Sequence, residues 1–248
     1  MKDFVKKIIR KTGFEIRRFS KVSPPIGEVR DFLAQVKERG FHPEGIIDVG
    51  ANKGSWTMMA RSVFPKAKFL MIEPQEEMAG PLSELCRVHE GIDFVQAGAG
   101  KESGQLVQTI WNNLEGSSFV PDVDEAKVQQ GKQRLTPVVS IDELLLDRKD
   151  FCPDLVKMDI QGFEIEALKG AESLFGRTEL FILETSLYEF MQSMPLAKDC
   201  ISFMSSKGYE IYDIAEYFRR PLDGALGQID FAFAKREGVL RKSNDWTE

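Results

Sequence analysis

The chain has 248 residues, of which 33 are Lys or Arg and 39 are Asp or Glu, and its formal net charge is −6. Hydrophobic residues make up 42% and charged residues 29%, which predicts a folded core and excludes disordered, collagen-like and disulfide-scaffold proteins. The acidic total argues against a nucleic-acid partner. No apolar run approaches the roughly 18 residues of a membrane span. Cys86, Cys152 and Cys200 lie far apart without metal-ligand spacing, so we expect a reducing, cytoplasmic compartment and no metal site.

The charge is distributed unevenly along the chain. Residues 1–21 hold eight basic and two acidic residues, whereas the rest of the chain holds 25 basic and 37 acidic ones. The apolar residues of this segment would share one face of a helix: Phe4, Val5, Ile8 and Ile9. Two interpretations stay open, a helix docked on the body of the protein and an anchor on anionic lipid at the inner face of the membrane. We therefore predict an arm and linker over residues 1–25 and one domain over residues 26–248.

From residue 26 onward, helical spacing of apolar residues alternates with short buried runs. Helices are predicted around residues 29–36, 56–63, 75–87, 141–146, 162–175 and 197–204. Strands are predicted at 45–50, 68–73, 92–97, 154–159 and 179–184. Between them lie two strands, 105–111 and 135–139, around a polar loop at 112–131, and the chain ends with strands 209–214 and 228–234. The last two strands have no helix between them, which indicates an antiparallel pair. The pattern predicts an α/β, Rossmann-like, doubly wound fold with a mainly parallel seven-stranded sheet.

Ligands of such sheets bind at the carboxyl ends of the strands, near the point where the strand order reverses. The first strand leads through Asp48-Val49-Gly50-Ala51-Asn52-Lys53-Gly54 straight into a helix. Its glycines allow the backbone to approach a ligand closely, and the helix N-terminus favours a carboxylate or phosphate. The second strand ends in Glu73, which can accept hydrogen bonds from both hydroxyls of a ribose. Together they indicate an adenosine-containing cofactor.

The glycine spacing decides between two such cofactors. A dinucleotide turn requires G-x-G-x-x-G, whereas this turn reads Gly50-x-x-x-Gly54. Asp48 would repel a pyrophosphate but attract the ammonium and sulfonium groups of S-adenosylmethionine. S-adenosylmethionine is therefore favoured, and a NAD-dependent oxidoreductase is the alternative. The adenine is expected near Ala97 and Gly98, where the third strand ends.

Three carboxylates are candidates for a catalytic role. Asp159 ends the fourth buried strand and should open into the cleft. Glu164 falls in the first turn of the next helix, where it could simply stabilise the helix N-terminus. Glu184 ends the fifth strand, where it could be a plain surface carboxylate. Asn112 and Asn113, in the polar loop, are weaker candidates for contacting an acceptor.

These motifs resemble the FkbM-type methyltransferases. Residues 47–54 are similar to the family's glycine loop and residues 69–74 to its second motif. The most specific match is 139–145 followed by 154–171, although Gln161 stands where the family usually has a glutamate. The resemblance covers about residues 45–235. It implies an S-adenosylmethionine-dependent O-methyltransferase that acts on a hydroxyl of a sugar, a glycan or a polyketide-like product.

The motifs assign two sets of residues. The cofactor-binding set is Asp48, Gly50, Ala51, Asn52, Gly54, Glu73, Pro74, Ala97, Gly98 and Asp159, and the candidate general bases are Asp159, Glu164 and Glu184. The insert at 105–137 and the loop between the last two strands are expected to form the acceptor side. Other classes fit less well. Enzymes that methylate nucleic-acid bases usually have an Asn/Asp-Pro-Pro-aromatic turn at the end of the fourth strand, where this chain has Asp-Ile-Gln-Gly at 159–162. A non-catalytic scaffold that binds a membrane or a partner is a third alternative. The presence of Asp48, Gly50, Gly54 and Glu73 argues against it.

Overall fold

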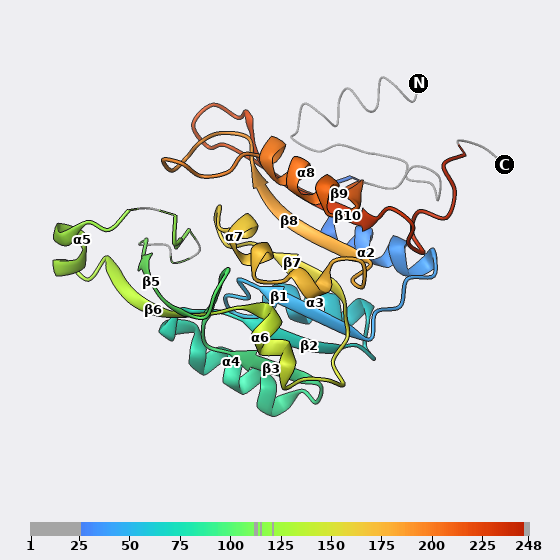
Figure 1. Ribbon diagram of the computed structural model, residues 1–248, viewed down its shortest axis with the longest axis horizontal. Coiled ribbons are helices and arrows are strands. Elements are labelled where there is room, and N and C mark those ends of the chain that lie inside the picture. The colour runs from blue at the N-terminus through green and yellow to red at the C-terminus, as the bar shows by residue number, and fades with distance from the viewer. Residues whose placement is uncertain (1–25, 112–113, 115, 121, 246–248) are drawn as a thin grey trace, which may run out of the picture.

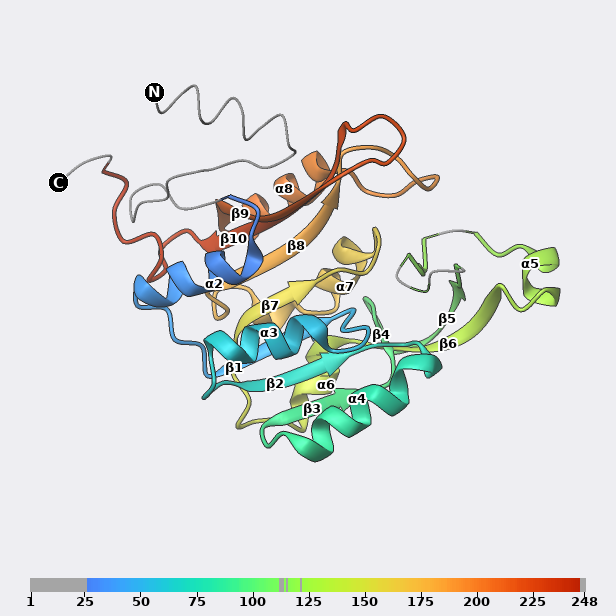
Figure 2. The same cartoon turned by 180° about the vertical axis from the view of Figure 1, so that it is seen from behind.

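The computed structural model describes residues 26–111, 114, 116–120 and 122–245. The predicted basic arm lies outside this part of the chain. A central sheet runs through the molecule with helices on both of its faces (Figures 1 and 2). The strands of this sheet are β1 (Gly45–Val49), β2 (Lys68–Ile72), β3 (Ile92–Val95), β7 (Pro153–Met158), β8 (Leu180–Ser186), β9 (Tyr209–Arg219) and β10 (Leu226–Lys235).

The strand order is β3-β2-β1-β7-β8-β10-β9. Strands β3, β2, β1, β7 and β8 pair in parallel, whereas β10 is antiparallel to both β8 and β9. This confirms the predicted Rossmann-like, doubly wound α/β fold with its seven-stranded sheet and C-terminal antiparallel pair. The strand order reverses between β1 and β7, so a crevice is expected at their carboxyl ends.

Six helices of the described residues cover the sheet. On one face α2 (Val29–Glu38), α3 (Ser55–Val63) and α4 (Glu76–Val88) share a core with the sheet. On the other face lie α6 (Ile141–Leu146), α7 (Glu164–Lys169) and α8 (Ala197–Ser206). None of the helices in the described ranges is long and apolar enough to cross a membrane.

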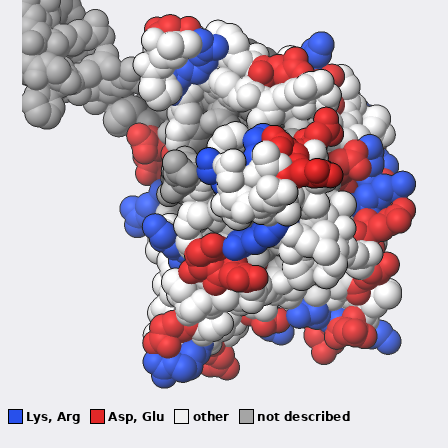
Figure 3. Space-filling model, turned by 90° about the vertical axis from the view of Figure 1, so that its left-hand side faces the viewer, with Lys and Arg blue, Asp and Glu red and all other residues white. Residues whose placement is uncertain are grey.

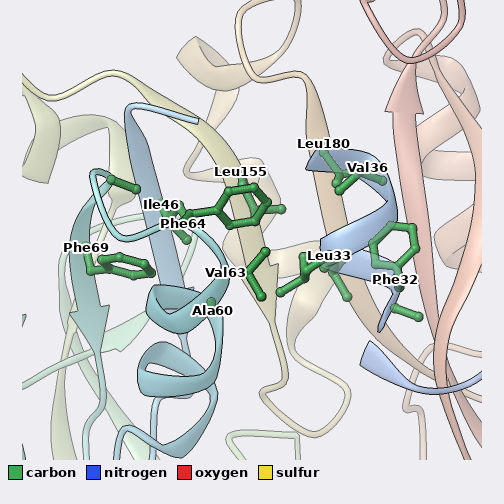
Figure 4. Packing of buried hydrophobic residues seen from close by; sticks show 14 of the residues in the cluster. Phe32, Leu33, Val36, Ile46, Ala60, Val63, Phe64, Phe69, Leu155 and Leu180 are labelled. Atoms are coloured by element: carbon green, nitrogen blue, oxygen red, sulfur yellow. The ribbon is translucent and has the colours of Figure 1, made fainter. Parts of the chain in front are cut away.

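Helix α2 shows how the apolar spacing produces this packing. Phe32, Leu33 and Val36 recur at helical spacing and are 0–3% exposed. Figure 4 shows them against the sheet beside Leu155 and Leu180, which come from two neighbouring parallel strands. Burial of each such side chain contributes about 1.5–3 kcal/mol, so this face fixes α2 on the sheet.

Three strands between residues 98 and 139 form a second, smaller sheet. Its strands are β4 (Gly98–Ala99), β5 (Gly104–Thr109) and β6 (Gln133–Val139), in the order β4-β6-β5. The expected polar loop at 112–131 contains a short helix, α5 (Glu125–Gln129), which corrects the prediction. The Asp124 side chain caps this helix by accepting from the backbone N–H groups of Ala126 and Lys127. Asn112 and Asn113 lie outside the described residues.

The helix predicted over 162–175 is also wrong in extent. It is split into α7 and a 3₁₀ turn, η1 (Glu172–Leu174), with Gly170 between them. A Cβ on Gly170 would lie 2.1 Å from the carbonyl oxygen of Gly100, so the two backbones touch there. The Gly170 carbonyl accepts from the backbone N–H of Asp142 and the hydroxyl of Ser140, both outside the helix. Contact with distant segments therefore ends the helix.

We expect Gly170→Ala to lower the free energy of unfolding by about 2 kcal/mol, because the added methyl must displace backbone atoms. Chemical denaturation in urea measures this change. Gly104→Ala is the matched control, since a Cβ there meets nothing within 4 Å. We expect the control to change stability by less than about 1 kcal/mol. Equal effects of the two substitutions would contradict the close contact between the Gly170 and Gly100 backbones.

Candidate active site

A cavity of about 570 Å³ opens at the carboxyl ends of β1 and β7, where the strand order reverses. Its walls come from the glycine loop after β1, the end of β2, the insert and the turn after β7. The residues used below line it: Gly50, Ala51, Asn52, Trp56, Glu73, Pro74, Gln75, Gly98, Lys157, Asp159, Gln161 and Glu184. We call it the donor cavity, after the methyl donor S-adenosylmethionine that the sequence predicts.

The glycine loop is held by the residues that the sequence singled out. Gly50 has φ +77°, and a Cβ on it would lie 2.0 Å from the carbonyl oxygen of Asp159, so only glycine fits. The carboxylate of Glu73 accepts from the backbone N–H of Asn52 at 2.8 Å and of Gln75 at 3.0 Å. Burial raises the pKa of Glu73, and these two hydrogen bonds oppose that rise. Glu73 therefore ties the loop to the end of β2.

A buried ammonium group joins the two central strands. Lys157 is 4% exposed, and its Nζ lies 3.5 Å from a carboxylate oxygen of Asp48 and 3.4 Å from one of Asp159. It also donates to the carbonyl of Gly50 at 3.3 Å. Burial opposes the charge, but the surrounding carboxylates outweigh it and raise the pKa of Lys157. Asp48 itself is fully buried and accepts from the hydroxyl of Thr57.

Further carboxylates continue across the sheet from this ion pair. Asp230 on β10 lies in register with Glu184 on β8 and with Glu216 on β9. Burial first, and then the charge of Asp159, raises the pKa of Glu184 well above its usual range. The same two causes raise the pKa of Asp230 to about 8, and burial also raises that of Glu216. Burial thus disfavours the charged form of each of these groups, whereas Asp159 has the Lys157 counter-ion.

Gln161 connects the two carboxylates of the cavity wall. Its side-chain amide donates to Asp159 at 2.9 Å and to Glu184 at 2.8 Å. Its backbone has φ +55°, a conformation that turns the chain sharply after β7, and its carbonyl accepts from Ser118 at 2.8 Å. An amide can donate to both carboxylates at once, whereas the glutamate typical of the family would add a third acid here.

Glu164 lies beneath this turn rather than in the cavity. It is 2% exposed, and its carboxylate accepts from the backbone N–H groups of Ile160 at 3.0 Å and Gly162 at 3.2 Å. Burial raises its pKa to about 7 against the lowering effect of these bonds. Glu164 thus stabilises the turn that presents Asp159 and Gln161.

The structure brings eight of the predicted residues to the donor cavity: Gly50, Ala51, Asn52, Glu73, Pro74, Gly98, Asp159 and Glu184. Four others do not line it: Asp48, Gly54, Ala97 and Glu164. Asp48 contacts Lys157 and Thr57 and does not line the cavity, and its role in attracting the donor stays a prediction. Gly54 has φ +76°, and a Cβ there would lie 2.4 Å from Leu85, so it allows α3 to pack against α4.

Sequence reasoning assigned no role to Lys157 or Asp230. A lysine inside the apolar run Leu155–Met158 was the available signal, because an unpaired charge is not tolerated in a buried strand. Asp159 follows Lys157 by two residues, a spacing that places both side chains on one face of an extended chain, whereas Asp48 lies on the neighbouring strand β1 and no spacing in the sequence shows that it meets Lys157. Asp230 lies on a strand that was predicted, but its neighbours Glu184 and Glu216 depend on the register of pairing.

The donor cavity also offers unused polar atoms. Within the described residues, the indole Nε1 of Trp56 and the side-chain oxygen of Gln75 are buried without a hydrogen-bond partner. Both residues line the cavity, so one donor and one acceptor are available to a ligand. These atoms, with the N-terminus of α3 and the carboxylate of Glu73, fit an adenosine-containing cation that also carries a carboxylate.

Residues 48–211, more than half of the chain, match the family described as the methyltransferase FkbM domain. The chain belongs to this family. This FkbM-domain protein is 30% identical over 155 residues to methyltransferase sdnD of Sordaria araneosa, with 51% of this chain and 60% of that protein covered. It is 24% identical over 144 residues to methyltransferase 1 of Beauveria bassiana (strain ARSEF 2860), with 51% and 58% covered. The chain thus spans about 60% of the length of these curated relatives.

A solved structure of precorrin-6y C5,15-methyltransferase from Geobacter metallireducens GS-15 is similar to this FkbM-domain chain, with 13% sequence identity and a TM-score of 0.45. The similarity covers 82% of this chain and 86% of the chain in that structure. Family membership supports S-adenosylmethionine as the methyl donor, in agreement with the prediction from the glycine loop. It argues against the NAD-dependent alternative.

Glu164 makes stability depend on pH. Its pKa of about 7 in the folded protein lies above the ordinary value of 4.5, so its contribution is complete below about pH 4.5 and is lost as pH rises through about 7. Glu164→Gln keeps an oxygen that can accept both backbone N–H groups but does not titrate. We therefore expect the variant to gain up to about 3 kcal/mol relative to the wild type between pH 5 and pH 8.

Urea denaturation at several pH values measures this difference. Glu166→Gln, two residues along the same helix, is the control, because Glu166 is half exposed and pairs with Lys169 at the surface. We expect the control to keep a constant difference from the wild type across this range. A Glu164→Gln difference that also stays constant would contradict the raised pKa.

Proposed function

We propose that this protein transfers a methyl group from S-adenosylmethionine to a hydroxyl group of a sugar, a glycan or a related small molecule. The observation that carries the proposal is the position of Asp159. Its carboxylate lines the donor cavity with 37% of the side chain exposed, and its backbone touches the glycine loop at Gly50. A carboxylate beside the donor loop can accept the proton that an alcohol must lose when it becomes methylated.

The donor would be held by the loop and the end of β2. Glu73 has lone pairs left on both oxygens after its two backbone bonds, so it can also accept from ribose hydroxyls. Gly98, which follows strand β3 and begins β4, lines the same cavity. Its position there supports the expected site of the adenine. Asp48 would act at a distance, by placing Lys157 under the loop.

S-adenosylmethionine, when bound, supplies a methyl group whose carbon–sulfur bond breaks with its electron pair left on sulfur as the carbon–oxygen bond forms. Asp159 would take the hydroxyl proton as general base, a contribution of about 10²–10⁴-fold. Lys157 and Gln161 hold the Asp159 carboxylate in place through the contacts described above. Glu184 is less suited to act as the base, because its raised pKa favours the protonated form. Glu164 would position the turn.

Two further parts of the proposal rest on the sequence. Residues 1–21 lie outside the described residues, and their surplus of basic side chains supports contact with anionic lipid at the inner face of the membrane. The acidic remainder of the chain supports a small-molecule or glycan acceptor over a nucleic acid. The chain covers only part of its curated relatives, so both statements are proposals for this chain and not for those longer proteins.

We expect Glu73→Ala to weaken the binding of S-adenosylhomocysteine by about tenfold or more, since it removes a charged acceptor and releases the loop. Isothermal titration calorimetry measures the dissociation constant. Glu77→Ala is the matched control, because Glu77 pairs with Arg134 at the surface and does not line the donor cavity. Unchanged affinity in the Glu73 variant would remove that residue from the donor site, and absence of binding by the wild-type protein would overturn the proposed function.

The acceptor class is tested in cells that lack this protein. Mass spectrometry of their polysaccharide and glycolipid should show loss of one methyl group from a sugar, and expression of the wild-type protein should restore it. Asp159→Asn should restore little, because it cannot accept the proton, whereas Asp147→Asn, at an exposed residue after α6, should restore it fully. Full restoration by Asp159→Asn would exclude Asp159 as the base. Unchanged sugars in the deficient cells would exclude this acceptor class.

A further inference from the structure

A second cavity, of about 980 Å³, lies beside the donor cavity. It lies between the outer part of the insert, formed by β5, β6 and α5, and the turn that joins β9 to β10. In Figure 1 the insert extends away from the main sheet, with α5 at its tip. We call this space the acceptor cavity.

The two cavities are continuous. Four residues line both: Gly116, Gln161, Phe218 and Gln228. Gln161 donates to Asp159, the candidate base, at 2.9 Å. A molecule in the acceptor cavity can therefore extend a hydroxyl past Gln161 towards Asp159 while the rest of it stays outside the donor cavity.

Large apolar side chains line the acceptor cavity. Trp111, Phe190 and Phe218 are 43%, 49% and 44% exposed, and Met191 lies beside them. Several half-exposed aromatic side chains around one hollow are unusual on a free surface and are typical of a ligand site. The cavity walls therefore favour a molecule with an apolar body.

The charge of these walls is opposite to that of the whole chain. The wall residues include four cations and one carboxylate: Lys127, Lys132, Arg219, Arg220 and Asp124. Lys127 lies 3.8 Å from Asp124, and Arg220 pairs with Asp223 at 2.9 Å while stacking on Tyr188. Lys132 and Arg219 have no carboxylate oxygen within 4.0 Å among the described residues.

Figure 3 looks at the side of the molecule from which the insert projects. Uncharged surface alternates with groups of basic and acidic side chains, in the middle of this view as well as at its borders. The guanidinium of Arg219 donates to the carbonyl of Gly224 at 2.9 Å, and this hydrogen bond holds the side chain in position. A positioned cation next to an apolar hollow complements a molecule that has an anionic group on an apolar body.

We propose that the acceptor cavity binds a small organic anion, with its apolar body between Trp111, Phe190 and Phe218 and its acidic group at Lys132 and Arg219. This inference extends the proposed function. It depends on that function only where it identifies the bound molecule as the methyl acceptor. The acceptor is then a hydroxyl-bearing small molecule with a carboxylate or a similar acid, and the net acidity of the chain does not exclude it. Recognition of the acidic group depends on the surplus of cations in the cavity wall, not on the net charge of the whole chain.

A pair of fluorescent probes tests this inference without methyl transfer. 1-Anilinonaphthalene-8-sulfonate carries an acid group, and N-phenyl-1-naphthylamine has the same rings without it. In the double variant Lys132→Gln/Arg219→Gln, we expect the sulfonate probe to bind about fivefold or more weakly than to the wild-type protein. The neutral probe should stay within about twofold, because the apolar walls are unchanged.

Two controls separate this result from other causes. Lys68→Gln/Lys149→Gln removes two cations from a different hollow, beside β2, and should leave both probes unaffected. S-adenosylhomocysteine should bind the Lys132/Arg219 double variant with unchanged affinity. Equal binding of the sulfonate probe to the wild type and this variant would overturn the inference in favour of a neutral acceptor. Failure of S-adenosylhomocysteine to bind any of these proteins would instead overturn the proposed function and leave the probe result in force.

Discussion

Lys157 holds the two central strands of the sheet together through charge. Its Nζ lies 3.5 Å from Asp48 on β1 and 3.4 Å from Asp159 after β7, in a position that is almost free of water. Loss of one partner from a buried ion pair typically costs about 3–5 kcal/mol, because the other charge stays buried and uncompensated. Its bond to the Gly50 carbonyl extends the same network to the glycine loop. The loop that would receive the donor and the carboxylate that would serve as base therefore depend on a single ammonium group.

The same network sets the protonation of its surroundings. Glu184 and Asp230 lie further from the ammonium group along the sheet, and burial with the negative charge of Asp159 raises their pKa values. One carboxylate keeps a counter-ion, and its neighbours tend to stay protonated. Gln161 fits this arrangement, since its amide donates to Asp159 and Glu184 without adding a negative charge. A mixed set of this kind suits proton acceptance at a defined atom better than a row of equivalent acids would.

Some of these features could be read directly from residue patterns. The helical spacing of Phe32, Leu33 and Val36 and the apolar run of β1 gave the correct elements, because burial on one face imposes those periods. Gly50 and Glu73 were found because a tight turn and a strand-end acid are local features. The helix after residue 162 was predicted too long, since Gly170 ends it through contact with Gly100, a residue far away in the chain. Helix α5 was missed within a polar stretch, although Asp124 provides its cap.

The sequence by itself determined the order of the elements, the position of the glycine loop and the family, because these depend on neighbouring residues and on periodic burial. The tertiary structure alone decided which charges meet. Asp48 pairs with Lys157, and Glu164 accepts from the backbone of the turn after β7 and does not line the cavity. The cations Lys132 and Arg219 come from an insert and a hairpin that are remote in the chain and line one hollow. Electrostatic interactions depend on distance in space, so the sum of charges along the chain could not reveal a basic cavity on an acidic protein.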